Sequence, residues 1–221
     1  MRVYICRLTL HESLFYATRE VGRLYETGRY LHNYALTYAL GLATAPYFNP
    51  TQVPRYAEQL SPLNGRGIYV TPARGVRIEY QLATFKYADN AYHVEMEKGS
   101  RNTPSFGRVR ELAAGSTFEF AVLSAAEALR LPRWIRLGLW RSKAELVCNE
   151  VEAVRRGMSE AQAFFPLNPL DTAGVLQAFD LISMPPASLV DHATLLAEWW
   201  VWRINGNDMY LPADLMYRLP S

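Results

Sequence analysis

The densest group of chemically active side chains lies between residues 133 and 143, in the sequence RWIRLGLWRSK. Guanidinium groups grip phosphate in bidentate pairs, and indole rings stack on bases, so the mixture suits a polyanion threading past a loop. Gly138 permits a turn or a close backbone approach, and the Ser142 hydroxyl can donate a hydrogen bond to phosphate. The alternative is a loop of solvated cations over a packed tryptophan. The predicted contacts are Arg133, Arg136, Trp140, Arg141, Ser142 and Lys143.

A second basic group lies near the start of a helix that the spacing of apolar residues predicts over 28–42. Arg29 and His32 share a face of this helix at i, i+3 spacing, and cations there oppose the helix dipole, so a bound anion would relieve them. The alternative is an exposed face on which the arginines pair with Glu20 and Glu26. The further predicted contacts with the polyanion are Arg7, Arg19, Arg23, Arg29, His32, Arg108 and Arg110.

Motifs for catalysis are absent from the sequence: it has no phosphate-binding glycine loop with Lys-Ser/Thr, no HExxH and no nucleophile elbow. Metal-free RNA cleavage needs a base near the ribose hydroxyl, which His11 or His32 could supply. A lone histidine is more often structural. We therefore predict no catalytic residue, no metal site and no cofactor.

Charge is divided unevenly along the chain. Residues 1–143 carry 19 Lys and Arg against 11 Asp and Glu, whereas residues 144–221 carry 4 against 10. The resulting net charges of +8 and −6 suggest an anionic ligand for the first part and a protein partner for the second. The alternative is that these charges are simply scattered over the solvated surface.

Composition indicates a folded globular chain, because 50% of the 221 residues are apolar and 20% are charged. Cys6 and Cys148 lie in apolar runs, which predicts two buried free thiols in a reducing compartment. We see no signal peptide and no apolar stretch of the ~18 residues that a membrane span needs. A cytoplasmic protein without membrane contact is the default expectation.

Hydrophobic periodicity predicts an α+β fold with several antiparallel strands and short helices, arranged in a ferredoxin-like sandwich. In the strand at 2–10, Tyr4, Cys6, Leu8 and Leu10 form one face. The other expected elements are a loop at 12–27, the helix at 28–42, an excursion at 43–66, strands at 67–72 and 76–87, a polar hairpin tip or mobile loop at 88–104, strands around Arg108 and Phe118, and a helix at 124–130.

The chain changes character after residue 155, where it becomes acidic and rich in proline. We predict a body over 1–155 and a C-terminal part over 156–221 that packs on the same domain, with a helix around 187–198. The acidic residues, including Asp171, Asp180 and Asp191, predict a protein-docking surface that repels phosphate. Aromatic anchors would come from Phe164, Phe165, Trp199, Trp200 and Trp202; the alternative is that these rings fill the core of this chain.

Two segments carry a resemblance to a known family: LTLHESLFYATREVGRLYETGRYLHNYALTYALG (8–41) and RLGLWRSKAEL (136–146). They resemble the Csc-one proteins, the Cas-five-type subunits of type I-D CRISPR surveillance complexes (Cascade). The resemblance runs nearly end to end. Its most specific part is TRExGRLYET followed by LHNYAL.

The resemblance implies an RNA-recognition-motif-like ferredoxin fold of the repeat-associated mysterious protein (RAMP) class, with long insertions and a divergent C-terminal part. It also implies a cytoplasmic ribonucleoprotein of antiviral defence that holds the 5′ repeat-derived handle of CRISPR RNA. The expected neighbours are the large subunit and the terminal backbone subunit, with target DNA nearby. Processing is assigned to a different subunit in this complex type, and no Tyr-Lys-His grouping matches the relatives that cut RNA. A non-catalytic subunit is therefore expected, and a metal-independent endoribonuclease is the alternative.

Overall fold

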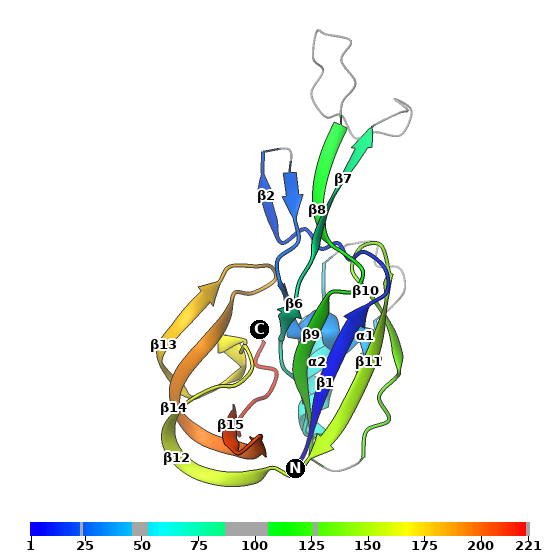
Figure 1. Ribbon diagram of the computed structural model, residues 1–221. Coiled ribbons are helices and arrows are strands. Elements are labelled where there is room, and N and C mark those ends of the chain that lie inside the picture. Colours follow the sequence, from blue (N-terminus) through cyan, green and yellow to red (C-terminus); the bar gives the residue numbers. More distant parts are fainter. Residues whose placement is uncertain (23, 46–52, 87–105, 126–127, 220–221) are drawn as a thin grey trace.

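The computed structural model describes residues 1–22, 24–45, 53–86, 106–125 and 128–219, and they form mostly antiparallel sheets with few helices (Figure 1). The helices are α1 (Asn33–Ala39), α2 (Tyr56–Gly65) and a 3₁₀ turn at Pro169–Asp171. The strands are β1 (Arg2–Leu10), β2 (Arg19–Val21), β3 (Leu24–Glu26), β4 (Tyr30–Leu31), β5 (Ile68–Val70), β6 (Ala73–Arg77), β7 (Tyr80–Lys86), β8 (Phe106–Leu112), β9 (Thr117–Ser124), β10 (Trp134–Leu137), β11 (Ser142–Val151), β12 (Val154–Gln162), β13 (Val175–Ile182), β14 (Leu189–Ile204) and β15 (Asn207–Pro212). The antiparallel sheet prediction is confirmed, while the ferredoxin-like arrangement stays a prediction.

The first sheet has the order β10-β11-β1-β9-β6-β4, with β5 also paired to β9. The predicted alternation of β1 is confirmed, because Tyr4, Cys6, Leu8 and Leu10 are all buried. They pack with residues of α1 in one apolar core. This face of the sheet is therefore closed by the chain itself.

The opposite face of the first sheet is only half covered. At one end of β1 and β9, Val3, Ala121 and Leu123 pack in a second core with residues of β14. Towards the other end of β1 the same face presents Arg7, which is exposed. The change from apolar to charged residues along one strand face marks where the covering sheet ends.

The covering sheet has the order β12-β14-β13, with β15 also paired to β14 (Figure 1). The helix predicted over 187–198 is wrong, since these residues belong mostly to the 16-residue strand β14. Ala193, Leu195, Ala197, Trp199 and Val201 alternate at period two and are all buried. Period-two burial against the first sheet suits a strand and not a helix.

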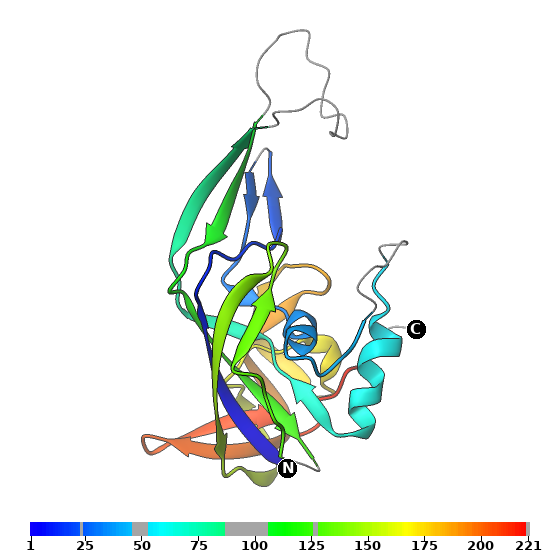
Figure 2. The same cartoon turned by 90° about the vertical axis from the view of Figure 1, so that its right-hand side faces the viewer.

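A third sheet, in the order β2-β3-β8-β7, projects from the end of the molecule (Figures 1 and 2). The loop predicted over 12–27 is therefore wrong in part, because it contains the β2–β3 hairpin. The expected tip at 88–104 lies outside the described residues.

Other element bounds also differ from expectation. The helix predicted over 28–42 is reduced to α1, because Tyr30 and Leu31 pair with β6 before the helix begins. The 43–66 excursion contains α2. The helix expected over 124–130 is absent from its described residues, where Ser124 ends β9 and 128–130 are irregular.

Cys6 and Cys148 are not free thiols, so that prediction is wrong. They lie opposite each other on β1 and β11 and form a disulfide. The two cysteines are 142 residues apart, and only the register between β1 and β11 brings them together, so the sequence alone did not predict the disulfide.

Several proposed docking residues of the C-terminal part are buried within this chain. Trp199, Trp202 and Phe165 are at most 3% exposed and belong to the second core. Asp171 and Asp191 are also fully buried. A docking surface built on these side chains is wrong, because they already pack inside the chain. The division at residue 155 stays a prediction. In the part of the chain that the structure describes, no helix is long and apolar enough to cross a membrane.

Candidate nucleic-acid interface

The β10–β11 hairpin places its cations and one indole on the uncovered side of the first sheet. Along β10, Ile135 and Leu137 are buried, whereas Trp134 and Arg136 are exposed. Lys143 lies opposite Arg136 on β11. The Lys143 ammonium nitrogen also lies 4.2 Å from the centroid of the Trp134 ring. A cation that can bind phosphate and a ring that can stack on a base are therefore neighbours on this hairpin.

The turn of this hairpin needs a glycine, as the sequence indicated. Gly138 has a φ of +72°, and a Cβ there would lie 2.7 Å from the carbonyl oxygen of Phe15. The Leu139 N–H donates to that same oxygen at 3.0 Å. Trp140, which is 46% exposed, also contacts the Phe15 ring at 5.6 Å between centroids. The turn, including Arg141, is therefore held against the segment that follows β1.

Ser142 lies inside this arrangement and not on its surface. Its side chain is 1% exposed, and its hydroxyl donates to the backbone oxygen of Ser13 at 2.5 Å. A phosphate cannot reach this hydroxyl without displacing the hairpin. Ser142 therefore positions the hairpin and is not part of the interface proposed below.

Strand register extends the basic surface across the first sheet. One row runs from Arg7 through Glu119 on β9 to Arg74 on β6. The next row joins Trp134, Glu145, Thr9, Thr117 and Arg77. We call this surface the open face. Its members are Arg7, Thr9, Arg74, Arg77, Thr117, Glu119, Trp134, Arg136, Lys143 and Glu145.

Most arginines here have a carboxylate partner on the surface. Arg7 lies 2.7 Å from Glu119, and Arg136 lies 3.4 Å from Glu12. Arg133, at the edge of the open face, hydrogen-bonds to Glu145 and thereby lowers the pKa of that carboxyl. Exposed pairs of this kind contribute little stability, so a phosphate can compete for the arginines.

A second basic surface lies on the projecting sheet. On β3, Glu26 lies opposite both Arg19 of β2 and Arg110 of β8, and Leu24 lies opposite Arg108 of β8. The three arginines therefore share one face of this sheet. The Arg110 guanidinium lies 4.3 Å from the centroid of the Tyr80 ring and 3.4 Å from Glu26. The structure thus brings three predicted contacts together. Arg23 lies outside the described residues.

Arg29 and His32 do not share a helix face, so that part of the prediction is wrong. Arg29 precedes β4 and its guanidinium donates to the Tyr30 hydroxyl at 3.2 Å. His32 is the N-cap of α1, where its Nδ1 accepts from the Tyr34 N–H. Burial lowers the pKa of His32 to about 4, so the ring is neutral at pH 7. With 4% exposure it caps a helix and cannot contact RNA directly.

The structure adds open-face residues that sequence reasoning missed. Arg74 and Arg77 join the surface only through the pairing of β6 with β9. Beside the open face, His11, which the sequence offered only as a candidate base, lies next to Trp134, with 5.0 Å between ring centroids. The sequence could have identified Trp134 as a surface residue, because the alternation of WIRL places it on the same side of the strand as Arg136. Within the described residues, no cluster of three or more His, Cys, Asp or Glu side chains is arranged to hold a metal ion.

A family model described as "Type I-D CRISPR-associated protein Cas5/Csc1" matches residues 1–219, nearly the whole chain. The chain belongs to this family. As a Cas5/Csc1 protein it is a CRISPR effector subunit, which confirms the resemblance of its two sequence segments. No curated protein sequence matches the chain.

Two solved structures show a weak similarity to this Cas5/Csc1 protein. One is a chain from a cryo-EM structure of type III-B Cmr-beta bound to cognate target RNA and AMPPnP, with 11% identity, a TM-score of 0.48, and coverage of 87% of this chain and 86% of that one. The other is a CRISPR protein from Archaeoglobus fulgidus, with 10% identity, a TM-score of 0.42, and coverage of 96% and 100%. Because both TM-scores lie below 0.5, neither carries an argument about fold or function.

Proposed function

We propose that this Cas5/Csc1 protein is a non-catalytic CRISPR RNA-binding subunit of a type I-D Cascade. It would hold the 5′ repeat-derived handle and bridge the large subunit and the terminal backbone subunit, with target DNA nearby. The observation that carries the RNA-binding role is the open face, on which Lys143 lies against a half-exposed Trp134 and shares the face with Arg136 and Arg7. Cations that follow a backbone, together with an aromatic ring for a base, are the usual means of holding single-stranded RNA.

Charge on the sheets supports the same role. The basic residues of the open face and of the projecting sheet all come from the first 143 residues, where the net charge is +8. Arginine predominates there over lysine and can hold phosphate with two parallel hydrogen bonds. We infer that the RNA backbone crosses the open face and continues to Arg19, Arg108 and Arg110.

Binding of a single-stranded repeat RNA by the purified protein is expected to depend strongly on salt. Each phosphate neutralised on a single strand contributes about −0.7 to the slope of log K against log salt. Contacts from most of the open-face cations predict a slope of about −3. Filter binding between 50 and 200 mM KCl (about a fourfold range) would measure it. A slope near zero would show that the charged open face is not what holds RNA.

The alternative function is a metal-independent endoribonuclease. Within the described residues, His32 is buried and serves as a helix cap, and His11 lies 3.4 Å from Glu145. We expect no cleavage when the protein is incubated with repeat RNA, with or without EDTA. Cleavage by the unmutated protein that disappears in the His11→Ala, His32→Ala double variant would establish the nuclease instead.

Partner docking is better assigned to the edge strands of the covering sheet than to the buried aromatic residues. β12 and β13 are the outer strands of that sheet. They expose large apolar side chains, among which Leu181 is 64% exposed. The others are Val154, Met158, Val175 and Phe179. Exposed apolar side chains on an edge strand are typical of a surface that another chain covers.

The double substitution Phe179→Ser, Leu181→Ser is expected to reduce incorporation of the subunit into the complex at least about tenfold, because hot-spot side chains each contribute about 2 kcal/mol. Co-purification with the other subunits would measure it. A matched control is Val53→Ser, Leu170→Ser, which also replaces two exposed apolar side chains. Normal assembly of the first variant, or an equal loss in both, would count against docking through β13.

A further inference from the structure

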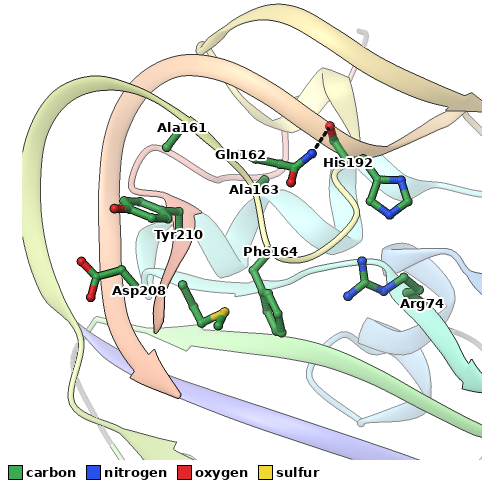
Figure 3. Close-up of a pocket in the computed structure, with 9 residues that line it drawn as sticks. Arg74, Ala161, Gln162, Ala163, Phe164, His192, Asp208 and Tyr210 are labelled. Atoms are coloured by element: carbon green, nitrogen blue, oxygen red, sulfur yellow. Dashed lines mark hydrogen bonds between the residues drawn. The ribbon is translucent and has the colours of Figure 1, made fainter. Parts of the chain in front are cut away.

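A pocket of about 550 Å³ opens where the covering sheet meets the first sheet (Figure 3). Arg74 of β6 contributes one wall, and residues of β12, β14 and β15 contribute the others. Phe164, in the segment after β12, supplies an aromatic wall. A cavity of this volume is within the usual range for small-molecule sites. Nothing in the RNA path described above accounts for it.

The guanidinium of Arg74 is held in place at this pocket. It lies 3.5 Å from Asp191, whose carboxylate is fully buried. Asp191 in turn accepts hydrogen bonds at 2.9 Å from the Tyr30 hydroxyl and from the His192 N–H. Arg74 remains 27% exposed. Its guanidinium is therefore positioned by the buried network and can still bind an anionic ligand group in the pocket.

The aromatic wall is also fixed. Phe164 packs edge-on against Phe165 with 4.8 Å between centroids, and its N–H donates to the Tyr210 carbonyl oxygen at 2.9 Å. The Arg74 guanidinium carbon lies 5.7 Å from the centroid of the Phe164 ring. The Arg74 guanidinium thus lies over this ring, and a cation and an aromatic surface share one wall of the pocket, where a nucleotide can contact both.

Polar side chains of Gln162 and His192 also line the pocket (Figure 3). The Gln162 amide nitrogen donates to the His192 carbonyl oxygen at 3.0 Å. This bond fixes the side-chain amide and leaves its oxygen to accept a hydrogen bond from a ligand. His192 has a φ of +50°, a conformation that non-glycine residues rarely adopt, and its ring pairs with Asp180 at 2.8 Å. These groups can hydrogen-bond to the edge of a planar heterocycle.

We infer that this pocket takes one unstacked nucleotide of the bound RNA, with its base against Phe164 and a phosphate on Arg74. The inference rests on the proposed function. The open face leads to the pocket, because Arg74 ends the row that begins at Arg7 and passes Glu119. An RNA backbone that follows this row reaches the pocket mouth, where extruding one base exchanges its stacking on a neighbouring base for stacking on Phe164.

The test compares two single-stranded probes of equal charge, an adenosine 12-mer and a 12-mer of abasic ribose phosphate, with the full chain. The ratio of their affinities measures what the bases contribute. Phe164→Leu is expected to lower adenosine 12-mer affinity about tenfold and to leave abasic affinity unchanged. Gln162→Ala, at an exposed position that spares the core, would remove a hydrogen-bonding group of the pocket and lower the affinity ratio in the same direction. Tyr56→Leu, which also replaces a half-buried ring but lies on α2, is the matched control, and it should change neither affinity.

The outcomes separate this inference from the function on which it rests. If both probes bind in a salt-dependent manner but neither pocket variant changes their affinity ratio, the pocket does not take a base and the inference is overturned. If neither probe binds the chain, the proposed RNA-binding function fails and the inference fails with it. A variant that lowers both affinities equally also overturns it, because a stacking pocket must distinguish a base from its absence.

Discussion

The double substitution Arg136→Glu, Lys143→Glu is expected to weaken binding of single-stranded repeat RNA about a hundredfold. These two side chains are cross-strand partners beside the half-exposed Trp134. Each loss removes a charge-assisted hydrogen bond to phosphate, worth about 1.5–3 kcal/mol, and each new carboxylate repels the backbone. Filter binding at 100 mM KCl measures the change, and the salt slope should also become shallower by at least about 1.4.

The matched control is Arg155→Glu, Arg156→Glu on β12. These arginines are comparably exposed and also pair with carboxylates, Glu198 and Asp208. They belong to the acidic part of the chain and not to the open face. We expect less than about a threefold loss, which reflects only the altered net charge. Equal losses in the two double variants would mean that RNA responds to total charge and that the open face is not the binding surface.

Asp171→Ala is expected to have the largest effect on folding, with a loss of about 3 kcal/mol or more in the free energy of unfolding. The fully buried Asp171 carboxylate accepts hydrogen bonds from the Asn33 amide, the Tyr69 hydroxyl and the Arg218 N–H. These donors belong to α1, β5 and the C-terminal segment. Alanine would leave all three donors without this acceptor, and the two that are fully buried, Asn33 and Tyr69, cost about 1–3 kcal/mol each when unsatisfied. Urea unfolding would measure the loss.

The same carboxyl predicts a pH dependence of stability. Burial raises the pKa of Asp171 from 3.8 to about 6. Between these values the folded state binds the proton more tightly than the unfolded chain, so this group's contribution to stability falls as the pH rises from about 4 to 6. The shift of about two units corresponds to roughly 3 kcal/mol at most. Asp171→Asn should remove this part of the pH profile and retain more stability than alanine.

Asp180→Ala is the control for this prediction. Asp180 is also acidic and near the same end of the chain, but its side chain is 69% exposed and its partner is the exposed His192. Its loss should cost less than about 1 kcal/mol. If Asp171→Ala costs no more than Asp180→Ala, the buried network does not join the two parts of the chain.

Local patterns were sufficient for some parts of this protein. The alternation of Tyr4, Cys6, Leu8 and Leu10 predicted β1, because side chains on a strand point to opposite faces in turn. The glycine in RLGLWRSK predicted the tight turn that Gly138 makes. The charge division and the two family-like segments depend only on residue order, and the family is confirmed.

Other parts of the fold could not be predicted from short windows. The period of β14 was mistaken for a helix, because LLAEWWVW has apolar residues at both helical and strand spacings. Asp171 and Asp191 were predicted as surface acids, although each lies within a buried hydrogen-bond network. Burial depends on which distant segments pack together, and composition does not contain that information.

By itself the sequence determined the family, the basic first part with its cationic and aromatic segment at 133–143, and the alternation that buries one face of β1. Only the tertiary structure decided which cations share a surface. Strand register places Arg74 and Arg7 on either side of Glu119 on β9, in one row of the open face. His32 and Ser142, which the sequence predicted as contacts, are buried and cannot reach RNA. The physical reason is that residue type fixes what a side chain can bind, but pairing between strands far apart in sequence fixes its neighbours and its access to solvent.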